Sequence, residues 1–366
     1  MKNKLLTTTA ISAAMLMGVS VANAQTTVKG QVHLSYRALS NDSPAGKVNG
    51  SYRAFGKETQ LDVQTKGKLN NGMDYAAGFS IEHDGEELSQ TSQQATTANS
   101  SGMFNENVYI DITSGKTTFT VGADHIQNPD FTIVNFLGLR ADPEDIFSGV
   151  SNSAATTASS NGGSVYPGKA TTSYDSFGAG IVQDLGIAKA SYFYTPGGNA
   201  TGDNGGATTF QAQADTGESR HEIMLRGDLG VKGLDATVFY SMQDAEGQSA
   251  QDNEGKMLGL KYTMGNITVG GELKKNIGSS NTVTGKSFGA AYAVNKDLSV
   301  AVGQLKADAD GTTAGNFQEQ IRFVSAAYSL GPVVTGLTFA KGENLGGTNV
   351  AGIDGDVLFL QLSTAF

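Results

Sequence analysis

The segment VKGQVHLSYRA, residues 28–38, alternates strictly between two kinds of side chain. Its even positions are apolar or small, and its odd positions are all polar: Lys29, Gln31, His33, Ser35 and Arg37. A period of two places successive side chains on opposite faces of a β-strand. The segment therefore predicts a strand with one apolar face and one hydrated face.

The same alternation recurs along the chain, with polar residues between the apolar ones. The apolar positions are Leu61 and Val63; Met73, Tyr75, Ala77, Phe79 and Ile81; Val108, Ile110 and Ile112; Ile223, Leu225 and Leu229; Leu234, Ala236, Val238, Tyr240 and Met242; Leu258, Leu260, Tyr262 and Met264; and Leu358, Leu360, Leu362 and Phe366. This repetition predicts an all-β chain in which most strands separate an apolar side from a wet side.

Short and long connections between these segments alternate along the chain. The short ones have the composition of hairpin turns and lie at 70–72, 114–116, 184–186, 231–233, 265–266, 295–297 and 331–332. The long ones are rich in Gly, Asn, Asp, Ser and Thr and lie near 39–54, 85–102, 125–170, 196–219, 245–255, 276–285, 309–318 and 342–355. Together they predict about sixteen antiparallel strands.

Short turns at one end and long loops at the other are typical of a transmembrane β-barrel with periplasmic turns and extracellular loops. Closure satisfies every backbone group that would otherwise be unpaired in hydrocarbon. The alternative is a secreted β-sandwich or a repeat adhesin, which also alternates. Charged groups on the polar face favour the barrel, as do tyrosines on the apolar face, which fit an interfacial girdle: Tyr36, Tyr75, Tyr192, Tyr194, Tyr240, Tyr262, Tyr292 and Tyr328.

The first 24 residues are typical of a signal peptide. Lys2 and Lys4 precede an apolar stretch, and Ala22-Asn23-Ala24 supplies the small residues of a cleavage site. We therefore expect residues 1–24 to be removed and residues 25–366 to form one barrel domain. The mature part has no run of about 18 apolar residues, which a transmembrane helix would need.

Composition excludes several classes of function. The net charge is −10, and losing two lysines with the signal peptide leaves −12, which argues against a nucleic-acid surface and favours cations as partners. There is no cysteine, the four histidines are scattered, and neither a nucleophile elbow nor a phosphate-binding loop occurs. We therefore expect no catalytic residues, no metal site and no cofactor.

Taken together, these features resemble the general diffusion porins of Gram-negative bacteria, which are sixteen-stranded trimers of the outer membrane. The resemblance covers nearly the whole mature chain in architecture, and its sharpest piece is the last strand, Leu358 to Phe366. This strand alternates and stops on an aromatic residue, which resembles the signal read by the barrel-assembly machinery. The resemblance implies that Phe366 carries that signal.

The longest connection, 125–170, is also the third long one and holds an acidic cluster. In the family this loop folds into the barrel, and its acids face basic groups on the wall. The resemblance thus implies that Asp142, Glu144 and Asp145 border the pore constriction. The basic partners are less defined, and the candidates are Arg37, Arg53 and Arg140. Strand parity puts Arg53 on the lipid face unless a bulge intervenes.

The function expected from the sequence is passive diffusion of small hydrophilic solutes and ions, with some preference for cations. The resemblance implies a homotrimer in outer-membrane lipid. Divalent cations that bridge acidic loops to lipopolysaccharide phosphates are a further hypothesis. The alternatives are a substrate-specific channel, or a structural or adhesive barrel that does not conduct.

Overall fold

The computed structural model describes residues 25–42, 51–84, 104–123, 135–139, 177–195, 218–245, 253–278, 281–311, 317–345 and 353–366. The described residues form sixteen strands. Within these ranges, no helix is long and apolar enough to cross a membrane. The expected signal peptide, residues 1–24, lies outside the described residues.

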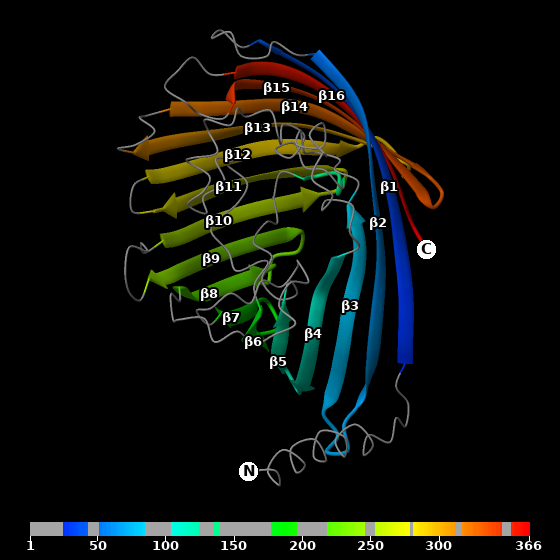
Figure 1. Cartoon of the computed structure of the whole chain (residues 1–366), viewed down its shortest axis with the longest axis vertical. Coiled ribbons are helices and arrows are strands. Elements are labelled where there is room, and N and C mark those ends of the chain that lie inside the picture. The colour runs from blue at the N-terminus through cyan, green and yellow to red at the C-terminus, as the bar shows by residue number, and fades with distance from the viewer. Residues whose placement is uncertain are drawn as a thin grey trace, which may run out of the picture.

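The strands follow the chain in order around a ring (Figure 1). They are β1 (Gln25–Asp42), β2 (Ser51–Lys68), β3 (Asp74–Asp84), β4 (Phe104–Ser114), β5 (Thr117–Ala123), β6 (Phe177–Asp184), β7 (Lys189–Thr195), β8 (Glu218–Gly227), β9 (Leu234–Ala245), β10 (Asn253–Met264), β11 (Ile267–Ile277), β12 (Asn281–Ala293), β13 (Leu298–Gly311), β14 (Phe317–Leu330), β15 (Val333–Leu345) and β16 (Ile353–Ala365).

The sheet closes on itself. Each strand pairs antiparallel with the next, and β1 pairs with both β2 and β16. No strand is left as an edge, which is the condition for a sheet to exist in a bilayer. The predicted antiparallel barrel of about sixteen strands is confirmed.

The period of two sorts the side chains between the inside and the outside of the barrel. On β1, His33, Ser35 and Arg37 point inward and are buried, whereas Val28 and Leu34 point outward and are exposed. Residues that face each other across an antiparallel pair share a side of the sheet, so each register fixes the next strand. All eight tyrosines expected at the girdle lie on the outer side by this register.

Seven short turns join the hairpins at one end of the barrel, as predicted. Three of them have only two residues, Gly115-Lys116, Gly265-Asn266 and Gly331-Pro332, and their glycines have φ of 61°, 59° and 68°. A left-handed conformation at this position matches the twist of the strands in a two-residue hairpin, and glycine adopts it without strain.

Several long connections are shorter than predicted, because the strands extend into them, and the connection at 276–285 is an example. The loop expected at 276–285 shrinks to residues 278–280, because Lys275, Asn276 and Ile277 pair with Thr284, Val283 and Thr282. A polar composition typical of loops therefore belongs here to strand residues. The strands of a barrel can rise beyond the hydrocarbon layer, where both faces are in contact with water or polar groups.

The inner side of the wall is not uniformly polar. On β13–β16, six inward positions near the long loops are apolar and as fully covered as the neighbouring Glu319: Leu305, Ala307, Ile321, Ala340, Val357 and Phe359. The corresponding sequence segments, such as Val357-Leu358-Phe359-Leu360, are apolar on both sides. This sector of the barrel therefore has a packed inner surface.

Candidate permeation pathway

Five residues of the longest connection, Asn135 to Leu139, form a compact turn inside the barrel. The Asn135 side chain accepts a hydrogen bond from the Leu139 amide at 3.0 Å and donates one to the Leu139 carbonyl at 2.7 Å. An asparagine that bonds both backbone groups of a residue four positions on fixes the turn locally.

This turn lies against the inner wall at two glycines. A Cβ at Gly289 on β12 would stand 2.7 Å from the Phe136 ring, and one at Gly336 on β15 would stand 2.6 Å from Leu139 Cδ2. Both glycines face inward in the strand registers, and Leu139 is 8% exposed. The described part of the third long loop therefore lies within the lumen, beside the apolar sector of β13–β16.

Four predicted site residues, Arg140, Asp142, Glu144 and Asp145, lie outside the described residues. Their placement at a constriction stays a prediction. Arg140 directly follows Leu139, whose side chain lies inside the barrel.

Arg37 points into the barrel, as its position on the hydrated face of β1 predicts. It lies opposite Phe359 of β16 and is 2% exposed. Ser35 and Leu39 flank it on the same inner face, and both are buried. Arg37 thus supplies a cationic group on the inner side of the barrel wall, where neighbouring protein atoms cover it.

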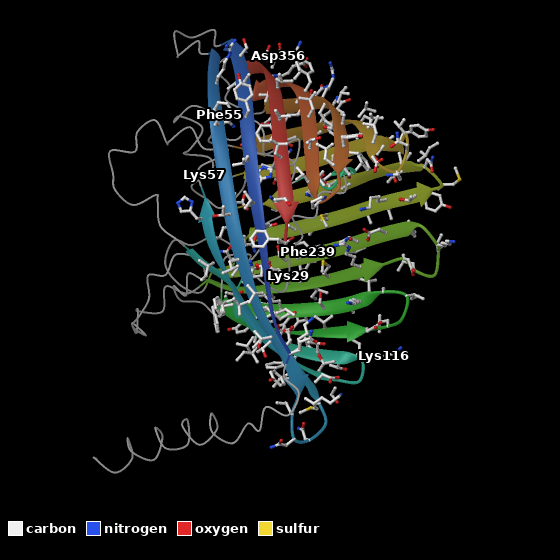
Figure 2. The ribbon with its side chains drawn as sticks, turned by 90° about the vertical axis from the view of Figure 1, so that its right-hand side faces the viewer. Lys29, Phe55, Lys57, Lys116, Phe239 and Asp356 are labelled. Atoms are coloured by element: carbon white, nitrogen blue, oxygen red, sulfur yellow. The ribbon has the colours of Figure 1, made fainter. Side chains whose placement is uncertain are left out.

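Arg53 does not line the lumen, so its assignment to the constriction is wrong. The β1–β2 register runs from Gln25 to Ser40 without a bulge and sets Arg53 opposite the outward Ala38. Phe55, two residues further on, is 85% exposed, and its ring centroid lies 5.0 Å from that of the outward Tyr36. Lys57 shares this outer face (Figure 2). The alternation of side chains along β2, taken without a bulge, therefore predicts the direction of Arg53 correctly.

A polar network covers the inner wall on β2–β4. Asp62 accepts hydrogen bonds from the Gln60 amide at 2.6 Å and the Ser80 hydroxyl at 2.7 Å. Ser80 in turn accepts from Gln60 at 3.2 Å and from Asn107 at 3.1 Å, and Gln31 of β1 donates to Gln60. The sequence placed several of these residues on the hydrated face but did not connect them, because the cross-strand register is not visible in it.

Charges on the inner wall divide into two sectors. Those on β2–β4 are mostly acidic: Glu58, Asp62, Asp74, Glu82 and Asp111, with Lys66 and Lys68 near the short turns. Those on β8–β11 are mixed and paired. Arg226 holds Asp235 by two hydrogen bonds of 3.0 and 3.1 Å, and Lys261 lies 3.6 Å from the same carboxylate.

A second inner pair on β11, Lys274 with Glu272, has an N–O distance of 3.2 Å. Arg226, Lys261 and Lys274 on this side therefore have protein counterions, whereas acids outnumber basic groups on β2–β4, where Lys68 pairs with Asp74. This difference gives the lumen an uneven charge distribution.

Among the described residues, no cluster of three His, Asp or Glu side chains has the geometry of a metal site. The inner wall instead presents dispersed polar groups, many of which have hydrogen-bond partners inside the protein. Such a surface is suited to contact with water and dissolved ions along its length.

The comparisons with known proteins agree with this architecture. The anion-selective porin from Comamonas acidovorans superimposes with a TM-score of 0.64 at 14% identity, over 94% of this chain and 100% of that one. Outer-membrane expressed OmpT of Vibrio cholerae gives 0.59 at 8% identity, over 95% and 99%. A porin refined at 1.8 Å resolution gives 0.57 at 10% identity, over 93% and 100%. These likenesses concern the fold.

No curated protein matches this chain in sequence. The family model for Gram-negative porins, in contrast, matches residues 7–347, which is nearly the whole chain. The chain therefore belongs to the Gram-negative porin family, and it forms a channel in the outer membrane.

Proposed function

We propose that this porin is a general diffusion channel for small hydrophilic solutes and ions, that it leans towards cations, and that it has no enzymatic activity. The observation that carries the proposal is the contrast between the two sides of one closed wall. The outer side is a belt of exposed apolar residues, and the inner side bears charged and amide groups on most strands. Lipid solvates the first side and water the second.

The narrowest part of the pathway is proposed to lie at the third long loop, of which residues 135–139 lie within the lumen. Leu139 is packed inside the barrel, and an extended chain spans at most about 3.6 Å per residue. Asp142 is three residues further on, so its Cα lies within about 11 Å of that of Leu139. This reach supports Asp142, Glu144 and Asp145 as acids of the constriction, with Arg37 and Arg140 as basic candidates.

The preference for cations rests on charge. The chain carries a net charge of −10, and the inner wall of β2–β4 is dominated by carboxylates. A low-dielectric wall focuses that field into the lumen. The Comamonas acidovorans porin is described as anion-selective, so this part of the proposal depends on the wall charges of this chain and not on the shared fold.

The proposed partners follow the family. We infer a homotrimer of the mature chain 25–366 in outer-membrane lipid and lipopolysaccharide, assembled by the barrel-assembly machinery through Phe366. The outer apolar belt supports both lipid contacts and contacts between copies.

Liposome swelling tests general diffusion. Neutral sugars of increasing size should enter at rates that fall smoothly with size and rise linearly with concentration. Saturation by one sugar or organic acid, together with block of ion flow by that compound, would instead establish a substrate-specific channel. Absence of swelling for every solute would indicate a barrel with a structural or adhesive role.

Reversal potentials across a potassium chloride gradient test the selectivity. The proposal predicts a sign that corresponds to preferential potassium flow, and a potential that shrinks as ionic strength rises, because salt screens the wall charges. A clear preference for chloride would refute this part of the proposal and leave diffusion itself intact.

A further inference from the structure

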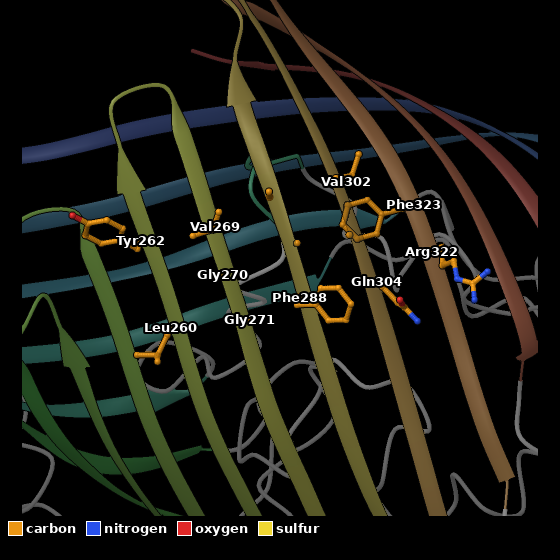
Figure 3. A pocket seen from close by; sticks show the side chains of 13 residues that line it. Leu260, Tyr262, Val269, Gly270, Gly271, Phe288, Val302, Gln304, Arg322 and Phe323 are labelled. Atoms are coloured by element: carbon orange, nitrogen blue, oxygen red, sulfur yellow. The ribbon is translucent and has the colours of Figure 1, made fainter.

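A groove of about 740 Å³ lies on the wall formed by β10–β14. Its lining follows two cross-strand rows on the outer side of the sheet (Figure 3). The row nearer the long loops is Leu260, Gly271, Phe288, Gln304 and Arg322, and the next is Tyr262, Val269, Ala290 and Val302. The small side chains of Gly271 and Ala290 leave a depression between larger apolar neighbours.

Basic residues stand directly on the loop side of this groove. Lys286 is two residues before Phe288 on β12, and Lys306 is two residues after Gln304 on β13. Residues two apart on a strand share a face and lie about 6.6–6.8 Å apart. Lys286, Lys306 and Arg322 therefore border the groove at its upper end.

Like charges face each other in this region. The registers set Lys256 opposite Lys275, Lys286 opposite Lys306, and Arg322 opposite Lys341, all on the outer side. Like charges directly across an antiparallel pair destabilise it. Three such pairs on adjacent hairpins destabilise the sheet, and an external anion bound between them would reduce the repulsion.

The protein itself neutralises only part of this charge. Glu343 lies 3.7 Å from Arg322 and 3.8 Å from Lys341, and Glu254 lies 2.6 Å from Lys256. Asp308, two residues from Lys306, accepts a hydrogen bond from Gln318. Over the described ranges neither Lys286 nor Lys306 forms an ion pair, and their pair borders the groove.

We propose that this groove and the three basic residues above it bind a phosphorylated, acylated glycolipid of the outer leaflet, the lipid A part of lipopolysaccharide. An acyl chain fits an apolar groove with small residues at its floor, and phosphates match Lys286, Lys306 and Arg322. Arginine and lysine above a hydrocarbon belt are the groups that recognise anionic lipid headgroups. The inference rests on the proposed function, in which lipopolysaccharide surrounds the barrel. It adds the place on the barrel wall where the lipid A part binds.

The test is a titration of the purified full-length barrel in detergent with bis-phosphorylated hexa-acyl lipid A, read by native mass spectrometry. The variant Lys286→Gln/Lys306→Gln/Arg322→Gln should bind lipid A at least about tenfold more weakly. Each basic group near an anionic lipid surface contributes about fivefold, and Glu343 already offsets part of the effect of Arg322. Unchanged affinity would overturn the proposal.

The matched control removes three charges at the other end of the barrel. Lys116, Lys232 and Lys296 are exposed in short turns, and their replacement by Gln should leave lipid A binding unchanged. Equal loss in both variants would mean that total charge, not this site, attracts the lipid, and would overturn the site. Titration with phosphatidylcholine, which has no net charge, should give no difference between variants.

A second variant tests the groove without touching charge. Ala290→Phe should fill the depression and weaken lipid A binding, whereas Ala179→Phe, on the outer side of β6, should not. Both variants and the charge variant should still conduct ions. Loss of lipid binding with conductance intact supports the site, and absence of conductance in the wild type would count against the proposed channel instead.

Discussion

The last residue of the chain, Phe366, pairs with Gly30 of the first strand, where the barrel closes. The two residues exchange backbone hydrogen bonds of 2.9 Å in both directions. The Phe366 ring covers the Gly30 backbone so closely that a Cβ there would stand 2.3 Å from the ring. Phe366 as a whole remains 76% exposed, with its ring on the outer side. The first and last strands thus meet at a glycine that leaves room for the terminal aromatic ring.

Phe366→Ala should separate the stability of the barrel from its assembly. Because the ring is mostly exposed, its loss should cost only about 1 kcal/mol in refolding from urea into detergent. Assembly in cells should drop much more, if Phe366 is the residue that the assembly machinery reads. The measurement is the heat-modifiable band in outer-membrane fractions, compared with refolding in detergent.

Gly30→Val is the companion to that variant. It keeps Phe366 but forces the ring aside, so it should weaken closure in detergent more than Phe366→Ala does. If each variant lost assembly in cells only in proportion to its loss of stability in detergent, Phe366 would act through packing alone.

Arg37 and Arg53 form a matched pair for testing the two sides of the wall. Arg37→Gln should shift the reversal potential further towards cations, because it removes an inward positive charge. Arg53→Gln should leave both conductance and reversal potential unchanged, because its side chain points outward. A shift in selectivity with Arg53→Gln would mean that the β1–β2 register is wrong.

The acidic sector of the inner wall should set the cation preference. Glu58→Gln with Glu82→Gln should lower the cation-to-anion permeability ratio severalfold, because the two inward negative charges attract cations and repel anions in the lumen. Asp354→Asn with Asp356→Asn, on the outer side of β16, provides the control and should not change the ratio. A ratio that is insensitive to the inner pair would place the selectivity elsewhere in the lumen.

The third long loop should be held by its contact with β15. Leu139→Ala removes a buried side chain, a change that costs about 2–5 kcal/mol in a packed site. Gly336→Ala presses a methyl group onto Leu139 from the wall side. Both should raise single-channel conductance or add current fluctuations while the barrel still migrates as a folded, heat-modifiable band. Currents identical to wild type in both variants would contradict this anchoring.

The sequence predicted the barrel well because one physical rule governs nearly every strand. Lipid on one side and water on the other force alternation, as in β1 from Val28 to Ala38, and a closed sheet needs hairpins of two lengths. Strand parity also placed Arg37 inside, and it would have placed Arg53 outside without the appeal to a bulge.

Alternation was less informative where neither side of the strand faces bulk water. Phe359 and Ile321 point inward and are fully buried, although apolar residues were expected only towards lipid. Alternation also did not predict that Phe136 and Leu139 lie against the inner wall at Gly289 and Gly336. Cross-strand pairs such as Lys286 with Lys306 could not be predicted from the sequence, because the two residues are 20 positions apart and the register decides whether they meet.

Single-channel recording of the purified protein in a planar bilayer tests the central claim most directly, namely that this wall encloses water. The account predicts ohmic steps whose conductance scales with the bulk conductivity of the electrolyte, in groups of three for a trimer. A correctly folded, heat-modifiable barrel that inserts into the bilayer and carries no current would contradict it.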